Sequence, residues 1–219
     1  MTDFFREVDE EVRRDRALLF WQKYQNWLIG AALLIILGVG GWRFYDNSRT
    51  QAAEAAGARY EAALTLMRDG KTDEAMAAFA AMEREDARGY AALSRFAAAD
   101  LTAAKDPEAG IKAYEALAAD GAVAAAIRDT AQLRAAMLRV DRDDPKEFEH
   151  KFAPLATSGQ AYRNSYRELL ALAAFKRDDF EAAGRWLDEI VVDPDAPQEL
   201  RGRAQAFLGL VRAGKLSSK

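Results

Sequence analysis

An uncharged run near the start of the chain limits what this sequence can fold into. No charged residue occurs from Trp27 to Trp42, and extending the run to Tyr45 gives nineteen residues with Arg43 as the only charge. At about 1.5 Å of rise per residue, such a helix nearly crosses a hydrocarbon layer about 30 Å thick. A core helix of a soluble protein would carry a polar stripe, and this run has none. The run therefore predicts a membrane span over residues 27–45.

The ends of the run also suit a membrane anchor. Trp27 at one end and Trp42 and Tyr45 at the other are the amphipathic aromatic residues typical of the two membrane interfaces, and Arg43 can extend its long side chain to the headgroups. A cleaved signal peptide would have a short basic start, whereas here twenty-six residues precede the run and six of them are acidic. We therefore expect an anchor that is kept.

The distribution of Lys and Arg predicts the orientation. Five basic residues lie in the first twenty-six positions, whereas Arg49 and Arg59, with Arg43 at the boundary, are the ones that follow the span closely. Cytoplasmic flanks carry the excess of positive charge. The expected organisation is a cytoplasmic tail over residues 1–26 and a domain over residues 46–219 on the other side, which is the periplasm in a Gram-negative bacterium. The protein would then be a single-pass inner-membrane protein.

The tail itself allows two interpretations. Phe5, Val8, Val12 and Leu19 recur at near-helical spacing. They fit a juxtamembrane helix that lies on the bilayer or continues the span, or a helix that docks on a partner. With six acidic residues against five basic ones, attraction to anionic lipid would be weak, which favours a protein contact.

Composition excludes several classes of protein. The chain has no cysteine, so it forms no disulfide and offers no thiol nucleophile or zinc-binding thiolate. A formal net charge of −4 and the absence of a Lys/Arg-rich run argue against a nucleic-acid binder.

The sequence after residue 48 predicts an all-α domain. It is rich in Ala, Leu, Glu and Arg and lacks the alternating β-branched runs of strands. Turn signals divide it into helices that pair up. They lie at 69–70, 104–107, 120–121, 141–145, 158–159, 177–179 and 193–197.

Three sets of residues recur at one spacing, which predicts a repeat of about 35 residues. The second helix of each pair holds a bulky residue, at Phe79, Tyr114, Phe152 and Leu187, with spacings of 35, 38 and 35. Three residues further on stand Met82, Leu117, Leu155 and Ile190. The first helices hold a small residue at Ala63, Ala98, Ala136 and Ala171. A small residue in one helix lets the next approach, and the large ones fill the gap to the following pair. This is the tetratricopeptide arrangement, an α-solenoid of helix hairpins.

Two features modify the regular array. In the third unit Phe148 stands at a position where the other units have a small residue, namely Ala75, Gly110 and Ala183. A large side chain at a close-packing position predicts that this pair splays or is degenerate. The last helix begins after Pro197 and carries Leu200, Ala204, Phe207 and Val211 on one face, so we expect it to cap the solenoid.

Three segments together resemble one family. They are the tail, most specifically Glu7 to Glu11, then the single span, and residues 163–211, of which Asp193 to Leu200 is the most specific part. This combination resembles the membrane-anchored tetratricopeptide proteins of the YfgM type, and most of all their alphaproteobacterial branch. That family is regarded as ancillary to the SecYEG translocon.

The resemblance implies partners as well as a location. It implies an inner-membrane scaffold that contacts export-channel subunits, periplasmic chaperones or exported chains, with lipid contacted through one span. Handing exported proteins to chaperones would be its role. The alternative is an organiser of envelope assembly or cell division that binds periplasmic partners without the translocon. The glycines of the span do not form a Gly-x-x-x-Gly motif, so dimerisation through the span is not predicted.

The tetratricopeptide consensus also predicts a groove lined by the first helix of each pair. Carried over by position, its lining in the first unit is Tyr60, Leu64, Met67 and Arg68. In the fourth unit it is Glu168, Leu172, Phe175 and Lys176. An apolar groove with a polar rim suits extended or helical peptide segments, and a methionine can repack around varied sequences. If the helix phase is shifted by one position, Leu64 and Leu172 are core residues instead.

Nothing in the sequence points to catalysis. The chain contains no phosphate-binding glycine loop, no His-Glu-x-x-His and no Gly-x-Ser-x-Gly. Its single histidine, His150, stands on a charged helix and is expected to be a solvated surface residue. The pairs Asp143-Asp144 and Asp178-Asp179 fall at turns, where aspartate caps the next helix. We expect no enzyme activity, no cofactor and no metal site.

Overall fold

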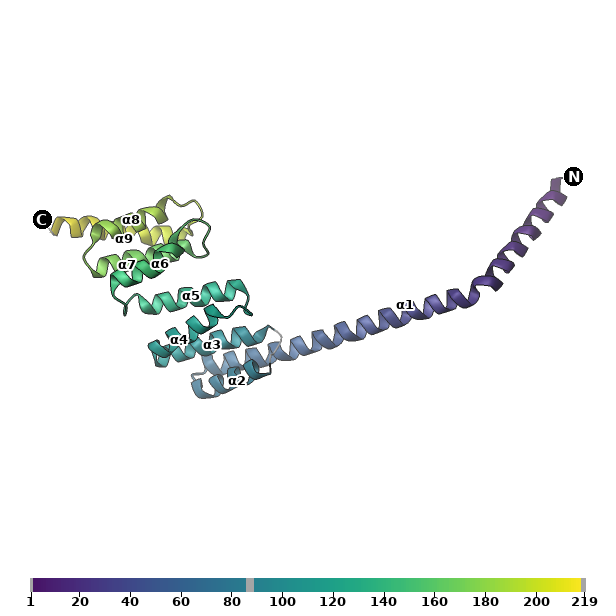
Figure 1. Ribbon diagram of the computed structural model, residues 1–219, viewed down its shortest axis with the longest axis horizontal. Helices are drawn as coiled ribbons and strands as arrows, with labels where there is room; N and C mark the ends of the chain where they lie inside the picture. The colour runs from purple at the N-terminus through teal and green to yellow at the C-terminus, as the bar shows by residue number, and fades with distance from the viewer. Residues whose placement is uncertain (1, 86–88, 218–219) are drawn as a thin grey trace. The chain divides into compact units, whose positions relative to one another are not determined.

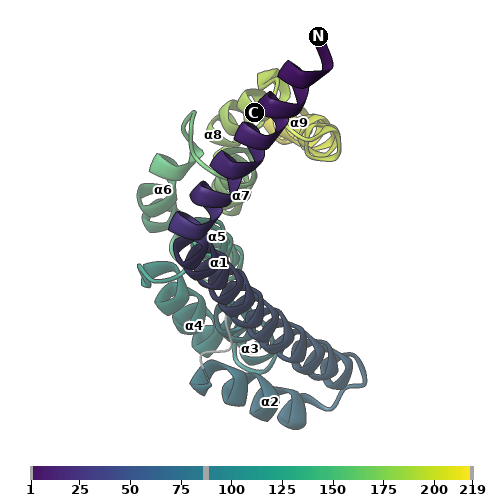
Figure 2. The ribbon, with the colours of Figure 1, turned by 90° about the vertical axis from the view of Figure 1, so that its right-hand side faces the viewer.

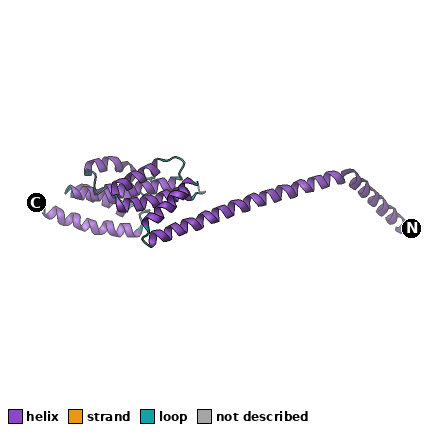
Figure 3. Ribbon diagram, turned by 90° about the horizontal axis from the view of Figure 1, so that it is seen from below, coloured by secondary structure: helices purple, strands orange, loops and turns teal. Residues whose placement is uncertain are grey.

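The computed structural model is all-helical throughout the part of the chain that it describes (Figure 3). It describes the backbone of residues 2–85 and 89–217, and the side chains of residues 21–85, other than 22, 24, 28 and 32, and of residues 89–213. The chain divides into two units, Met1–Ala55 and Ala56–Lys219. We call the second one the repeat unit. The predicted all-α fold is confirmed.

One helix, α1 (Thr2–Arg68), accounts for all of the first unit that is described and supplies the first helix of the repeat unit. The side chains of Phe5, Val8, Val12 and Leu19 lie outside the described residues, so the two interpretations of the tail both stand.

The repeat unit is a stack of helices in chain order (Figure 1). The elements after α1 are α2 (Thr72–Arg84), α3 (Tyr90–Lys105), α4 (Pro107–Ala119), α5 (Ala125–Arg139), α6 (Pro145–Phe152), the 3-10 helix η1 (Ala153–Ala156), α7 (Arg163–Lys176), α8 (Phe180–Val192) and α9 (Gln198–Ser217). Most of them pack against the next helix along the chain, whereas α5 packs against α4 and α7, and α6 packs against η1 and α7. Further contacts join α3 to α5 and α7 to α9. Figure 2 shows α2 to α9 following a curved path within this unit.

The seven predicted helix ends are all confirmed, and aspartates explain several of them. Asp106 accepts hydrogen bonds from the backbone N–H groups of Glu108 and Ala109 at the start of α4, and Pro107 follows it. Asp144 and Asp179 cap α6 and α8 in the same way. The sequence analysis does not predict the break between α2 and α3. Its one clear signal is Gly89, which has a φ of 86°.

The core consists of four apolar clusters, one for each hairpin. The bulky residues at the repeat spacing are the centre of them: Phe79, Tyr114, Phe152 and Leu187 are each at most 2% exposed. Of the small residues, Ala63, Ala136 and Ala171 are buried, whereas Ala98 is half-buried because its neighbours Ala97 and Ala99 face the two adjoining clusters. The predicted solenoid of hairpins is therefore confirmed.

The third hairpin is degenerate, as Phe148 predicts. This side chain is fully buried and its ring lies 4.6 Å from that of Phe152. The helix that carries both, α6, has only eight residues, against thirteen in α2, α4 and α8, and the chain continues as η1. Leu155 lies in η1 and is half-buried.

The last helix closes the far end of the stack. Leu200, Ala204 and Val211 of α9 are buried and Phe207 is partly buried, all in the cluster that α7 and α8 also build. The expected cap is confirmed.

Candidate partner-binding surfaces

The apolar segment of α1 is the first candidate surface. Among the described residues, one helical stretch is long and apolar enough to cross a membrane, and it lies in α1. None of its most apolar part is buried. The four expected anchor residues, Trp27, Trp42, Arg43 and Tyr45, are all exposed. A β-carbon added at Gly30, Gly38, Gly40 or Gly41 would meet nothing within 4 Å beyond the adjoining residues of the helix.

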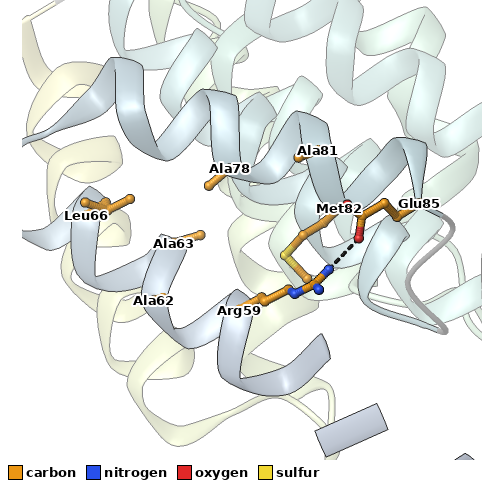
Figure 4. A pocket seen from close by; sticks show the side chains of 8 residues that line it. All are labelled: Arg59, Ala62, Ala63, Leu66, Ala78, Ala81, Met82 and Glu85. Carbon is orange, nitrogen blue, oxygen red and sulfur yellow. Dashed lines mark hydrogen bonds and ion pairs between the residues drawn. The ribbon is translucent and has the colours of Figure 1, made fainter. Parts of the chain in front are cut away.

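A groove between the end of α1 and α2 is the second candidate. Arg59, Ala62, Ala63 and Leu66 line one wall and Ala78, Ala81, Met82 and Glu85 the other (Figure 4). Both walls therefore follow the i, i+3, i+4, i+7 spacing of a single helix face. The groove encloses about 350 Å³. Small residues keep the two helices close together: Ala63 of the groove and Ala75 beside it are fully buried in one cluster.

An ion pair closes one end of this groove. The Nη1 atom of Arg59 donates to Oε2 of Glu85 at 2.5 Å (Figure 4), and both side chains are more than half exposed. An exposed pair of this kind contributes little to stability, so both charges remain available to a partner.

The groove residues predicted for the first unit lie on another face of α1. Leu64 and Met67 are half-buried against the apolar cluster of the first hairpin, which contains Phe79, and Arg68 is exposed. The ring of Tyr60 lies 5.8 Å from that of Phe79 and 5.5 Å from that of Tyr90. Burial, followed by the negative charge of Asp100, raises the pKa of Tyr60.

The groove residues predicted for the fourth unit are engaged by other helices. Glu168 accepts two hydrogen bonds from Arg203 of α9, at 2.8 and 2.9 Å. Lys176 donates to the carbonyl of Val140 at the end of α5. The ring of Phe175 lies 6.2 Å from that of Phe207 of α9, and Leu172 packs against the third-hairpin cluster. These positions join successive first helices.

A buried ion network holds the turn between α8 and α9. Asp193 accepts hydrogen bonds from Arg163, Asn164 and Arg167, at 2.7 to 3.1 Å. Its side chain is 8% exposed. Because the Arg163 guanidinium binds it directly, the pKa of the Asp193 carboxyl is held well below its usual range. The network explains the Asp193-Pro194 segment structurally and presents no substrate-sized cavity.

The residues singled out as possible chemical groups have structural surroundings in the described part of the chain. Within those residues, no three His, Asp or Glu side chains come together as a metal site would require. His150 is exposed on α6. Of the paired aspartates, Asp144 and Asp179 are caps, whereas Asp143 forms an ion pair with Arg139.

A family model described as a tetratricopeptide repeat-like domain matches residues 19–169. The chain belongs to the tetratricopeptide repeat-like domain family. The match includes the apolar segment of α1 and ends within α7. Searches of curated proteins and of solved structures each found no match. Domains of this family are interaction modules that are typically not catalytic.

Proposed function

We propose that this protein is a membrane-anchored scaffold that binds other proteins without chemical turnover. The observation that carries the proposal is the combination, in one chain, of a tetratricopeptide-like helical stack and an exposed apolar helical segment. A stack of hairpins presents long surfaces built from several repeats, which suits the binding of protein segments.

The proposed location rests on the sequence. We assign residues 1–26 to the cytoplasm, residues 27–45 to the inner membrane and residues 46–219 to the periplasm. The excess of basic residues in the tail supports this orientation. Cysteines introduced at Thr2 and at Ser48 test it in a chain with no other thiol. An impermeant thiol reagent added to intact cells should label the Ser48 position alone, and labelling of the Thr2 position alone would reverse the assignment.

The proposed partners are export-channel subunits, periplasmic chaperones and exported chains. The resemblance of the tail, the span and residues 163–211 to the YfgM type supports this finer assignment. Among the predicted groove positions, those of the first repeat are the better candidates for the contact. Arg68 is exposed there, whereas Glu168 and Lys176 already bind other parts of the chain.

Isolation of the full-length protein from its native membrane in mild detergent tests the proposal. Export-channel subunits should co-purify and be identified by mass spectrometry. The matched control replaces residues 27–45 with an unrelated span of equal length, which keeps the protein anchored. Loss of the channel from this control alone assigns the contact to the span. Recovery of soluble envelope proteins without any channel subunit, from both forms, would reject the translocon role in favour of an envelope organiser.

A further inference from the structure

The groove between α1 and α2 is the uncovered side of the first hairpin. Seven of the eight residues that line it belong to these two helices and the eighth, Glu85, caps α2, so α3 and the later helices contribute no lining residue. Packing against α3 uses mainly other residues of α2: Phe79 shares a cluster with Ala97 and Leu101 of α3. Met82 does both, since its sulfur accepts a hydrogen bond from Ser94 of α3 at 3.7 Å. In a solenoid, a side of this kind is normally covered by the next hairpin or by a cap.

The floor of the groove suits a second pair of helices. Ala62 is exposed, and Leu66, Ala78 and Ala81 are half-buried. Two small side chains on each wall, Ala62 and Ala63 on α1 and Ala78 and Ala81 on α2, would let another backbone approach closely. Leu66 supplies apolar area at one end.

The charges at the rim indicate that the second pair of helices is α1 and α2 of another copy of the chain. Arg59 on α1 and Glu85 at the C-terminal cap of α2 lie opposite each other at one end of the groove. A two-fold axis parallel to the groove would place α1 of one copy over α2 of another. Arg59 of each copy would then meet Glu85 of the second copy, and Leu66 would meet Ala78. The surface is thus complementary to itself, as a two-fold interface requires.

We propose that the chain forms a homodimer through this groove, with the hairpins of α1 and α2 packed face to face. Anchoring both copies in one membrane raises their effective concentration, so a modest interface is sufficient. The proposal concerns self-association and does not depend on which other protein is bound.

Charge exchange between two full-length chains tests it. Arg59→Glu gives a chain in which both charged residues of the rim are acidic, and Glu85→Arg gives a chain in which both are basic. Each variant alone should dimerise at least about tenfold more weakly than the wild type. Mixing the two should restore the dimer, because opposite charges then meet only across the interface. The measurement is co-purification of two differently tagged copies from native membranes, in mild detergent at low salt. It is made for the wild type, for each variant alone and for the mixture.

The mixture separates the interface from the pair within one copy. Within each variant the two rim charges repel each other, so a contact inside the monomer cannot produce the rescue. If wild-type copies do not co-purify, or if both single variants dimerise as well as the wild type, the proposal is wrong.

Cross-linking gives an independent readout, since the chain has no cysteine of its own. Copies carrying Ala62→Cys and copies carrying Ala81→Cys should be joined by a short thiol-reactive linker in the membrane. Ala116→Cys, on the exposed face of α4, is the matched control and should not react with either. Capture of a different protein at position 62, with no cross-linked copy, would overturn the proposal. Co-purification of export-channel subunits is measured separately. The homodimer can therefore be rejected without rejecting the translocon role, and the reverse also holds.

Discussion

Gly110 of α4 packs directly against the backbone of Ala103 in α3. A β-carbon at Gly110 would lie 2.4 Å from the β-carbon of Ala103 and 2.5 Å from its α-carbon. Gly110→Ala should therefore force the two helices apart and destabilise the protein by roughly 1–3 kcal/mol. Urea unfolding followed by circular dichroism measures the change. Gly202→Ala in α9 is the matched control, since nothing lies within 4 Å of that position. It should be neutral or stabilising, by up to about 1 kcal/mol.

Removing the charge of Asp193 should destabilise the end of the repeat unit. Asp193→Asn removes the buried counter-ion of Arg167, which is 9% exposed and keeps only the half-exposed Glu189 as an ion-pair partner. Breaking a buried pair in this way costs on the order of 3 kcal/mol. Asp195→Asn is the control: this side chain is 77% exposed and also binds Arg163, so its loss should cost less than about 1 kcal/mol. Thermal unfolding of both variants distinguishes a buried network from a general effect of charge.

Acid should weaken the same network. The pKa of Asp193 is lower in the folded protein than in the unfolded chain, because Arg163 binds the carboxylate. Its contribution to stability is complete above the unfolded pKa of about 4, and it is lost as the pH falls from there toward the depressed folded value. Stability measured from pH 6 to pH 2 should decline less steeply in Asp193→Asn than in the wild type. Parallel curves would show that the network does not titrate in this range.

Phe148 should be essential to the degenerate hairpin. Phe148→Ala removes a fully buried ring that packs on Phe152 and should cost about 3–5 kcal/mol. Met137→Ala on α5 removes a side chain that is 46% exposed and should cost about 1 kcal/mol or less. Equal losses in denaturant titrations of the two variants would mean that Phe148 does not hold this hairpin together.

Substitutions in the predicted groove should separate binding from stability. Phe175→Ala removes ring contacts to Phe180 and Phe207, so it should lower stability as well as any binding. Arg68→Glu changes an exposed residue whose nearest carboxylate, Glu61, is 4.0 Å away, and should alter stability by no more than about 0.5 kcal/mol. Reduced partner recovery with Arg68→Glu at unchanged melting temperature would support the first-repeat surface. Unchanged recovery would exclude Arg68 from it.

The fold was largely predictable because its determinants are local and periodic. Buried residues at one spacing, as at Phe79 and Tyr114, identify the hairpins, and aspartates such as Asp106 mark where helices begin. The break before Tyr90 was missed, because Gly89 alone is a weak signal among alanines that favour helix.

The surfaces were harder to predict than the core. Consensus positions indicate which residues of a first helix face outward, but they do not show what the next helix places against them. Glu168 is paired by Arg203, thirty-five residues away, and no local pattern specifies that contact. The groove between α1 and α2 arises because Ala62 and Ala81 come from different helices and remain uncovered. A pattern read along one helix does not show this.

The short reach of the contacts has a consequence for how the repeat unit acquires its structure. Where helices meet extensively in the described part of the chain, they are neighbours or next-but-one neighbours in sequence. Little chain entropy is therefore lost in closing each contact, and folding can begin at any hairpin and spread to the next. A chain delivered N-terminus first could thus build each hairpin on the one before it, so that α9 would be added last.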